Sequence, residues 1–205
     1  MNDESTSETR RLSSSGASQG RRRVLKLALG IGLCLPGARL ARAQDSDPRR
    51  ARPQTNDRFV FARGPRKGET ITLADLPAGG PPLIAFPIDP LSKTIRDGSR
   101  LNEVLLVRLE STDFSAETRA RAADGTVVAY SAVCTHTGCD EWDWQRASGM
   151  IKCPCHFSEF DLKDSARVMN GPAPRQLPAL PLAIVDGVPV VAGGFVGRPG
   201  FEAGG

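Results

Sequence analysis

Histidine occurs only twice in this 205-residue sequence, at His136 and His156. Cysteine is also scarce, and four of the five cysteines lie in the same stretch, residues 134–156. Thiolate and imidazole are the side chains that bind iron and other soft or borderline metals. Ordinary core composition does not explain why every histidine and nearly every cysteine gather in one place. The sequence therefore predicts a metal centre within residues 134–161.

Outside its N-terminus the chain has no excess of positive charge. The formal charge is +4, from 27 Lys and Arg against 23 Asp and Glu. Residues 1–43 hold eight of the basic and three of the acidic residues, which leaves 19 and 20 and a net charge of −1 for the remainder. A nucleic-acid-binding domain would carry a basic face. We therefore expect no nucleic-acid partner.

The sequence also lacks a hydrophobic run of clear membrane-spanning length. A spanning helix needs roughly 17–25 apolar residues, whereas the apolar stretch 27–35 is soon followed by Gly37 and Arg39. Residues 21–26 (Arg-Arg-Arg-Val-Leu-Lys) resemble a twin-arginine export signal, and Ala-Arg-Ala before Gln44 supplies a cleavage site. Residues 1–43 are therefore predicted to be a signal peptide of a periplasmic protein that is exported folded. The alternative is an uncleaved anchor in the inner membrane, with the domain facing the periplasm.

Glycine and proline are abundant, with 21 and 16 residues, and this favours many turns and a β-rich architecture. Alternating or short apolar runs predict strands, and Asp186-Gly187 predicts a hairpin turn. The predicted strands are 58–63, 70–73, 83–86, 103–110, 126–133, 182–185 and 188–191. Residues 116–123 are predicted to form a surface turn of helix. Residues 44–57 have no apolar side chain larger than alanine and are predicted to be a flexible tether, and the Gly-rich residues 196–205 a flexible tail.

The metal centre could have more than one chemistry. Its six candidate residues fall in two motifs: Cys134, His136 and Cys139, then Cys153, Cys155 and His156. A tetrahedral Cys2His2 zinc site uses four of them and leaves two cysteines unexplained. A domain stapled only by disulfides would leave the histidines unexplained. A third alternative uses all six residues.

Residues 134–139 (Cys-Thr-His-Thr-Gly-Cys) and 153–161 (Cys-Pro-Cys-His-Phe-Ser-Glu-Phe-Asp) resemble the two cluster-binding loops of the Rieske iron–sulfur proteins. Residues 171–174 (Gly-Pro-Ala-Pro) resemble that family's proline-rich loop. The resemblance implies an all-β fold, a Rieske-type antiparallel β-sandwich or barrel base with an inserted small cluster-binding subdomain. The domain would span 58–195 and the subdomain about 130–175.

The resemblance implies one [2Fe-2S] cluster. Cys134 and Cys153 would bind one iron through thiolates, and His136 and His156 would bind the other through imidazole nitrogens. Two neutral imidazoles in place of two thiolates raise the potential of such a cluster, to roughly −150 to +300 mV across Rieske centres.

A disulfide between Cys139 and Cys155 is also implied, as in the respiratory branch of the family. The ferredoxins of ring-hydroxylating oxygenases resemble this sequence in their ligands but lack that pair. A disulfide suits an exported protein, because the cytosol tends to keep cysteines reduced. Export and the disulfide together argue against an oxygenase ferredoxin.

Four further residues are assigned to tuning the cluster. Ser158 matches a serine whose hydroxyl donates to a cluster sulfide in high-potential members, whereas Phe160 stands where those members have a tyrosine donor to a ligand sulfur. One hydrogen bond that favours the reduced cluster is therefore absent, and we expect an intermediate potential. Gly138 is expected to permit an unusual backbone conformation or a close approach, and Pro172 belongs to the proline-rich loop.

A cluster of this type carries one electron and turns over no substrate by itself, so whether the chain counts as an enzyme depends on its complex. The resemblance implies an iron–sulfur subunit or partner of a periplasmic oxidoreductase, similar to the small subunit of arsenite oxidase. The partners would be a larger molybdenum subunit and a c-type cytochrome or cupredoxin. The alternative is the subunit of a membrane quinol–cytochrome c oxidoreductase with a cytochrome b-type partner. Membrane contact is expected only if the leader is retained.

Two tryptophans, Trp142 and Trp144, lie among acidic residues just after the first motif. We interpret the tryptophans as packing residues of the small subdomain and the acids as its solvated surface. The alternative is that Asp140, Glu141 and Asp143 form an acidic docking face for a basic cytochrome.

Overall fold

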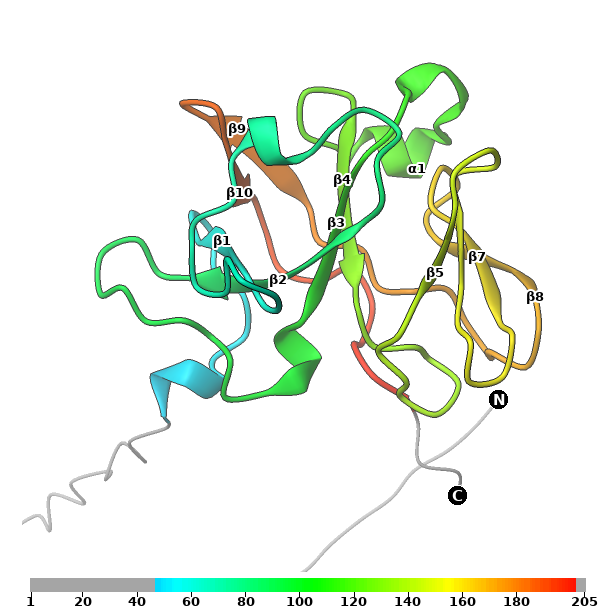
Figure 1. Ribbon diagram of the computed structural model, residues 1–205, viewed down its shortest axis with the longest axis horizontal. Coiled ribbons are helices and arrows are strands. Elements are labelled where there is room, and N and C mark those ends of the chain that lie inside the picture. The colour runs from blue at the N-terminus through cyan, green and yellow to red at the C-terminus, as the bar shows by residue number, and fades with distance from the viewer. Residues whose placement is uncertain (1–46, 202–205) are drawn as a thin grey trace, which may run out of the picture. The chain divides into compact units, whose positions relative to one another are not determined.

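The structure is a computed structural model that describes residues 47–201, so the predicted signal peptide (1–43) and residues 202–205 lie outside the described residues. Regular structure within this range is nearly all β-strand (Figure 1). The strands are β1 (Arg58–Phe61), β2 (Leu83–Ile88), β3 (Val104–Arg108), β4 (Val127–Ser131), β5 (Asp143–Gln145), β6 (Met150–Lys152), β7 (Glu159–Asp161), β8 (Arg167–Asn170), β9 (Leu182–Val185) and β10 (Val188–Val191). The helical elements are α1 (Ala116–Arg119) and the 3-10 turns η1 (Pro48–Arg50), η2 (Leu73–Asp75), η3 (Arg100–Asn102) and η4 (Ser111–Asp113). None of the helices between residues 47 and 201 has the length and apolar character needed to cross a membrane.

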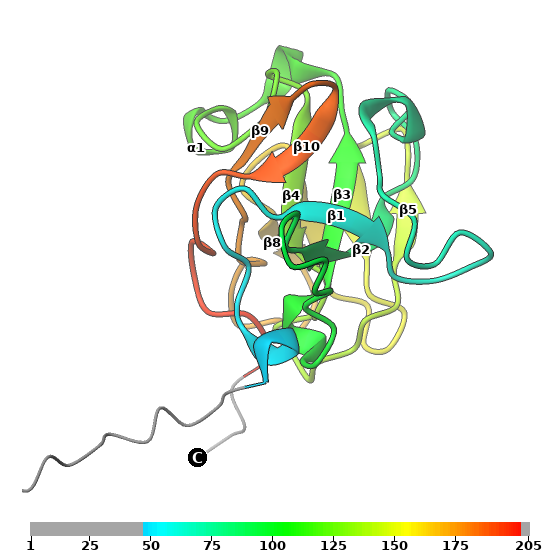
Figure 2. The ribbon, with the colours of Figure 1, turned by 90° about the vertical axis from the view of Figure 1, so that its left-hand side faces the viewer.

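Strands β1 to β4 form an antiparallel sheet in chain order, and β9 and β10 form the hairpin predicted around Asp186-Gly187. The hairpin lies between the two outer strands of that sheet (Figure 2). On one side the N–H of Val191 donates to the carbonyl of Asp57, just before β1, at 2.9 Å. On the other side the N–H of Leu180 donates to the carbonyl of Ala129 in β4, also at 2.9 Å. The base is therefore a sheet closed towards a barrel, which confirms the predicted fold class.

Strands β5 to β8 form a second antiparallel sheet that is inserted in the chain between β4 and β9. In Figure 1 this sheet lies to one side of β3 and β4, away from the hairpin. It is the inserted small subdomain that the resemblance implies, and the loops at its strand ends carry both cysteine–histidine motifs.

Strand β3 contributes side chains to two hydrophobic cores. Its residues 104–107 are all fully buried, and they alternate between two clusters. Val104 and Leu106 belong to the core inside the base, whereas Leu105 and Val107 belong to a core that continues into the small sheet through Ile151. A strand buried on both faces needs an unbroken apolar run rather than an alternating one. This is why residues 104–107 (Val-Leu-Leu-Val) form an unbroken apolar run.

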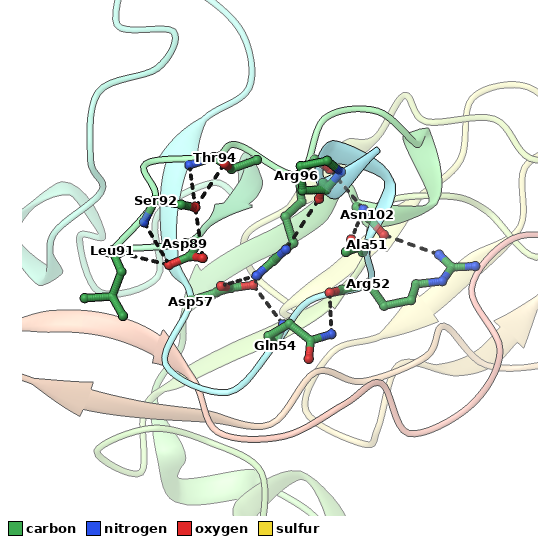
Figure 3. A network of polar contacts seen from close by, with 11 residues as sticks. Ala51, Arg52, Gln54, Asp57, Asp89, Leu91, Ser92, Thr94, Arg96 and Asn102 are labelled. Atoms are coloured by element: carbon green, nitrogen blue, oxygen red, sulfur yellow. Dashed lines mark hydrogen bonds and ion pairs between the residues drawn. The ribbon is translucent and has the colours of Figure 1, made fainter. Parts of the chain in front are cut away.

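The predicted tether is wrong for residues 48–57, which are held against the loop between β2 and β3 (Figure 3). The guanidinium of Arg96 donates to both carboxylate oxygens of Asp57, at 2.5 and 2.9 Å, and the two residues are only 7% and 2% exposed. The side-chain amide of Asn102 donates to the carbonyl of Ala51 at 2.8 Å. This segment has little apolar surface to bury, and charge-assisted hydrogen bonds to buried partners order it instead.

Three smaller differences concern local elements. Residues 70–73 do not form the predicted strand: Thr70 makes a single bridge to Val60, and the Asp75 carboxylate then accepts from the N–H of Thr72 at 2.8 Å and turns the chain into η2. The helical turn predicted for 116–123 is present but shorter, as α1. Residues 196–201 of the predicted flexible tail are ordered, because Val196 pairs with Ala179 in two backbone hydrogen bonds.

Candidate metal centre

The two motifs form loops at strand ends of the small subdomain. Loop 1 (residues 134–139) follows β4, and loop 2 (residues 153–158) connects β6 to β7. Their backbones are hydrogen-bonded in the same pattern. In loop 1 the N–H of Cys134 donates to the carbonyl of Cys139 at 2.7 Å, and in loop 2 the N–H of Cys153 donates to the carbonyl of Ser158 at 2.9 Å. The two loops are therefore two copies of one local structure.

The fifth residue of each loop closes this structure. The N–H of Gly138 donates to the carbonyl of Cys134 at 3.0 Å, and the N–H of Phe157 donates to the carbonyl of Cys153 at 2.8 Å. Both residues are in the left-handed region, with φ of 82° for Gly138 and 62° for Phe157. Glycine adopts this conformation at no steric cost, whereas a bulky side chain rarely does. The expectation that Gly138 permits an unusual backbone conformation is confirmed.

A disulfide between Cys139 and Cys155 joins loop 1 to loop 2, as the resemblance implies. Cys134 and Cys153 remain free thiols, and each is only 1% exposed. The Sγ atom of Cys153 lies within 4.8 Å of both disulfide sulfurs. The disulfide sulfurs are not available as ligands, so the two buried thiols are the sulfur donors that this site offers.

Burial raises the pKa of the Cys134 thiol to about 11, and the neighbouring Cys153 thiol acts in the same direction. The backbone N–H groups of His136 and Thr137 point at the sulfur and oppose this rise. A thiolate in such surroundings needs a positive partner, and a bound metal supplies one because it deprotonates a coordinating thiol. Two adjacent buried thiols with peptide donors aimed at one of them therefore fit a metal–sulfur site.

The two histidines meet beside the thiols. The centroids of the His136 and His156 rings are 4.6 Å apart, with the rings nearly perpendicular. The Nδ1 atom of His136 is buried and has no hydrogen-bond partner among the described residues. Leaving such an atom unpaired costs about 1–3 kcal/mol, so a metal ligand role for Nδ1 fits this structure. His156 is exposed, which places one imidazole at the surface of the site.

The loop 171–174 covers the site from a third side. The Oγ atom of Ser158, a fully buried residue, accepts from the N–H of Ala173 at 3.1 Å. A Cβ atom on Gly171 would lie 2.5 Å from the Cα of Ser158, so only glycine permits this approach. On the other side, the hydroxyl of Thr135 donates to the carbonyl of Arg175 at 2.6 Å. The proline-rich loop is thus hydrogen-bonded to loop 2, and Arg175, which directly follows it, to loop 1.

Loop 1 is also held to the base by charged side chains that the sequence analysis did not single out. The guanidinium of Arg100 donates to the carbonyl of Gly138 and lies 3.4 Å from the Asp140 carboxylate. Arg63 lies 3.3 Å from Asp140 and 3.2 Å from Glu141. No sequence signal marks these arginines, because they come from segments about 40 to 80 residues away.

The family model of the Rieske [2Fe-2S] domain matches residues 100–181 of this sequence. The chain contains a Rieske domain. The cofactor of the Rieske domain is one [2Fe-2S] cluster, so the zinc and disulfide-only alternatives are set aside. The ligand set Cys134, Cys153, His136 and His156 stays a prediction, which the buried thiols and the unpaired Nδ1 atom support.

The proteins to which this chain is similar are of several kinds. The cytochrome bc1 complex Rieske iron-sulfur subunit of Corynebacterium diphtheriae is 36% identical over 100 residues, 46% of this chain and 25% of that protein. The putative respiratory nitrate reductase subunit Rieske of Haloferax mediterranei is 38% identical over 109 residues, 51% of this chain and 47% of that protein. The soluble domain of the Rieske protein II from Sulfolobus acidocaldarius is 25% identical, with a TM-score of 0.38 over 50% of this chain and 66% of that one. The chain thus matches only a quarter to a half of the length of these two curated relatives.

The tryptophans of the Rieske domain pack as interpreted from the sequence. The indole N–H of Trp142 donates to the carbonyl of Ala132 at 2.8 Å, and its ring meets the Phe160 ring edge to face at 5.6 Å. Asp140 and Glu141 both pair with Arg63, and Asp140 also pairs with Arg100, so part of their negative charge is offset. This pairing weakens the alternative of an acidic docking face.

Replacing Ser158 with alanine should lower the midpoint potential of the cluster. The Ser158 hydroxyl accepts from Ala173, while its own hydrogen has no acceptor among the described residues and is free for a cluster sulfide. A hydrogen bond to sulfur favours the reduced, more negative state, so its loss favours the oxidised state. Protein-film voltammetry measures the change. Ser148→Ala, at an exposed serine in the turn between β5 and β6, is the control and should leave the potential unchanged; equal potentials in both variants would contradict this role.

Proposed function

We propose that the chain is a single-electron carrier that serves as the iron–sulfur subunit or partner of a larger oxidoreductase. The main support is the contrast between the two sides of the site: Cys134 and Cys153 are almost fully buried, whereas His156 is exposed. When bound, the cluster supplies reversible one-electron chemistry. The surrounding residues hold the thiolate side away from water and present the imidazole side to the surface, where an electron can enter or leave.

The residues near the exposed imidazole suit contact with another protein. Phe157 directly follows His156 and is 61% exposed, and Pro172 and Pro174 in the third loop are exposed as well. These side chains carry no charge. A partner that binds here buries apolar surface around the imidazole and shortens the path for the electron.

For the parent complex we propose a periplasmic oxidoreductase similar to arsenite oxidase, with a molybdenum subunit as electron donor and a c-type cytochrome or cupredoxin as acceptor. The twin-arginine-like residues 21–26 and the phenylalanine at position 160 favour it. The alternative is a membrane quinol–cytochrome c oxidoreductase with a cytochrome b-type partner, which the name of the Corynebacterium relative favours. The name of the Haloferax relative, a subunit of a putative respiratory nitrate reductase, fits the broader proposal of a subunit in a larger redox complex.

Purification of the tagged protein from its native host tests the parent complex. The mature N-terminus is mapped and the co-purified subunits are identified in the same preparation. A start near Gln44 together with a soluble molybdenum subunit supports the arsenite-oxidase-like proposal. An intact N-terminus in the membrane fraction with a cytochrome b-type subunit supports the alternative. A monomer that exchanges no electrons with c-type cytochromes or cupredoxins in stopped-flow mixing would overturn the proposed function.

Replacing Phe160 with tyrosine should raise the midpoint potential. The Phe160 ring is fully buried against the core next to Trp142, and the resemblance assigns its position to a tyrosine hydroxyl that donates to a ligand sulfur. The added donor would favour the reduced cluster. Voltammetry of Phe160→Tyr is compared with Phe61→Tyr, which makes the same chemical change at a half-buried ring in β1 of the base. If Phe160→Tyr shows no rise, the account of the lower potential is wrong.

A further inference from the structure

The end of the described chain runs back to the metal centre. Residues 196–201, called here the C-terminal strap, first pair with Ala179, with the N–H of Val196 donating to its carbonyl at 2.8 Å. Further along, the carbonyl of Gly200 accepts from the guanidinium of Arg175 at 2.6 Å, beside the proline-rich loop. Figure 1 shows this red segment approaching the loop that follows β4.

The strap ends on the backbone of loop 1. A Cβ atom on Gly138 would lie 2.6 and 2.7 Å from two ring carbons of Phe201, so the ring lies directly on this glycine. At the preceding residue, a Cβ atom on Gly200 would lie 2.8 Å from a Leu101 methyl group, which fixes the strap against η3 as well. Gly138 is therefore covered by an aromatic ring from the end of the described chain.

Gly138 takes part in two hydrogen bonds of loop 1. Its N–H donates to the carbonyl of Cys134, and its own carbonyl accepts from Arg100. Both hydrogen bonds strengthen when water is excluded, because the local dielectric constant falls. At the equivalent position of loop 2, the Phe157 side chain is 61% exposed, and the Lys152 ammonium lies 5.2 Å from the centroid of its ring.

We propose that the C-terminal strap is a fourth wall of the metal centre and that Phe201 is a positioning residue for loop 1. The ring keeps Gly138 in its left-handed conformation and keeps water from its two hydrogen bonds. The predicted ligands Cys134 and His136 are thereby held in the geometry that retains the cluster. The proposal rests on the cluster of the Rieske domain and is independent of the electron partner.

The test is the stability of the cluster in Phe201→Ala. The purified, cluster-loaded protein is mixed with an iron chelator, and the visible absorbance of the cluster is followed with time. Loss of the cluster should be about tenfold faster in Phe201→Ala, the lower end of the effect of removing outer-shell partners of a metal site. Phe201→Leu keeps an apolar cover and should restore most of the lifetime. A chain that ends at Arg198 should reproduce the alanine variant.

Val185→Ala is the matched control, because Val185 in β9 is 45% exposed and Phe201 is 43% exposed. This control should lose its cluster at the wild-type rate. The midpoint potential and the electron paramagnetic resonance spectrum provide a readout that a change in global stability would not move, and both should differ from wild type only in the strap variants. Wild-type cluster lifetime and potential in both Phe201→Ala and the shortened chain would overturn the proposal, as would equal acceleration in Val185→Ala.

Discussion

Replacing Cys134 with serine should yield a protein without the [2Fe-2S] cluster. The Cys134 thiol is 1% exposed and adjacent to Cys153, the second free thiol of residues 47–201, so no other free sulfur within that range can take its place. A serine hydroxyl does not ionise in such surroundings and is a hard donor where iron and sulfide favour a soft one. Iron and sulfide analysis together with the visible spectrum measures the loss. Cys153→Ser should have the same effect.

The fifth cysteine offers the control for this experiment. Cys34 falls in the predicted signal peptide, outside the described residues, and Cys34→Ser should retain a full cluster. A Cys134→Ser protein that still holds two irons and two sulfides would show that the ligand set is wrong. Because a metal site of this kind contributes its binding energy to folding, the cluster-free variant should also unfold at a lower temperature.

Removing the disulfide by the double substitution Cys139→Ala and Cys155→Ala should lower the free energy of unfolding by about 3 kcal/mol, the value for a closed loop of this size. The two cysteines are 16 residues apart in sequence, and they join loop 1 to loop 2. Their loss also frees the two ligand-bearing loops to move apart. Urea denaturation of the double variant and of the wild type measures the difference.

Two comparisons separate the covalent bond from the packing of the sulfur atoms. Wild-type protein treated with a strong reductant should approach the stability of the double variant, since it keeps both sulfurs but not the bond. Ala147→Gly, an exposed position in the turn between β5 and β6, should change the stability much less. If the reduced wild type stays as stable as the oxidised protein, the stabilisation does not come from the disulfide.

Features that depend on local sequence could be predicted well. The hairpin at Asp186-Gly187 was readable because its turn requires particular residues, and the disulfide followed from a resemblance carried by closely spaced residues. The apolar run around β3 was readable because a strand buried on both faces needs one. In each case the information lies within a few consecutive residues.

Features that depend on distant partners could not be predicted. Residues 48–57 are polar, and their order comes from Arg96 and Asn102, about 40 to 50 residues away. Arg63 and Arg100 hold loop 1 across a similar distance, and Phe201 reaches Gly138 from the end of the described chain. Long-range polar pairs leave no periodic signal in the sequence. Residues 48–57 were therefore predicted to be flexible from their polar composition. Only the folded chain reveals such contacts.

The shared strand β3 has a thermodynamic consequence. Its alternate residues Leu105 and Leu106 face different cores, one continuing into the small sheet and the other inside the base. If either core unfolds, one face of β3 becomes exposed to water. The two sheets are therefore expected to unfold as one cooperative unit. Binding of the cluster is then linked to the folding of the whole domain. The base therefore contributes to the affinity of the protein for the cluster, although it supplies none of the predicted ligands.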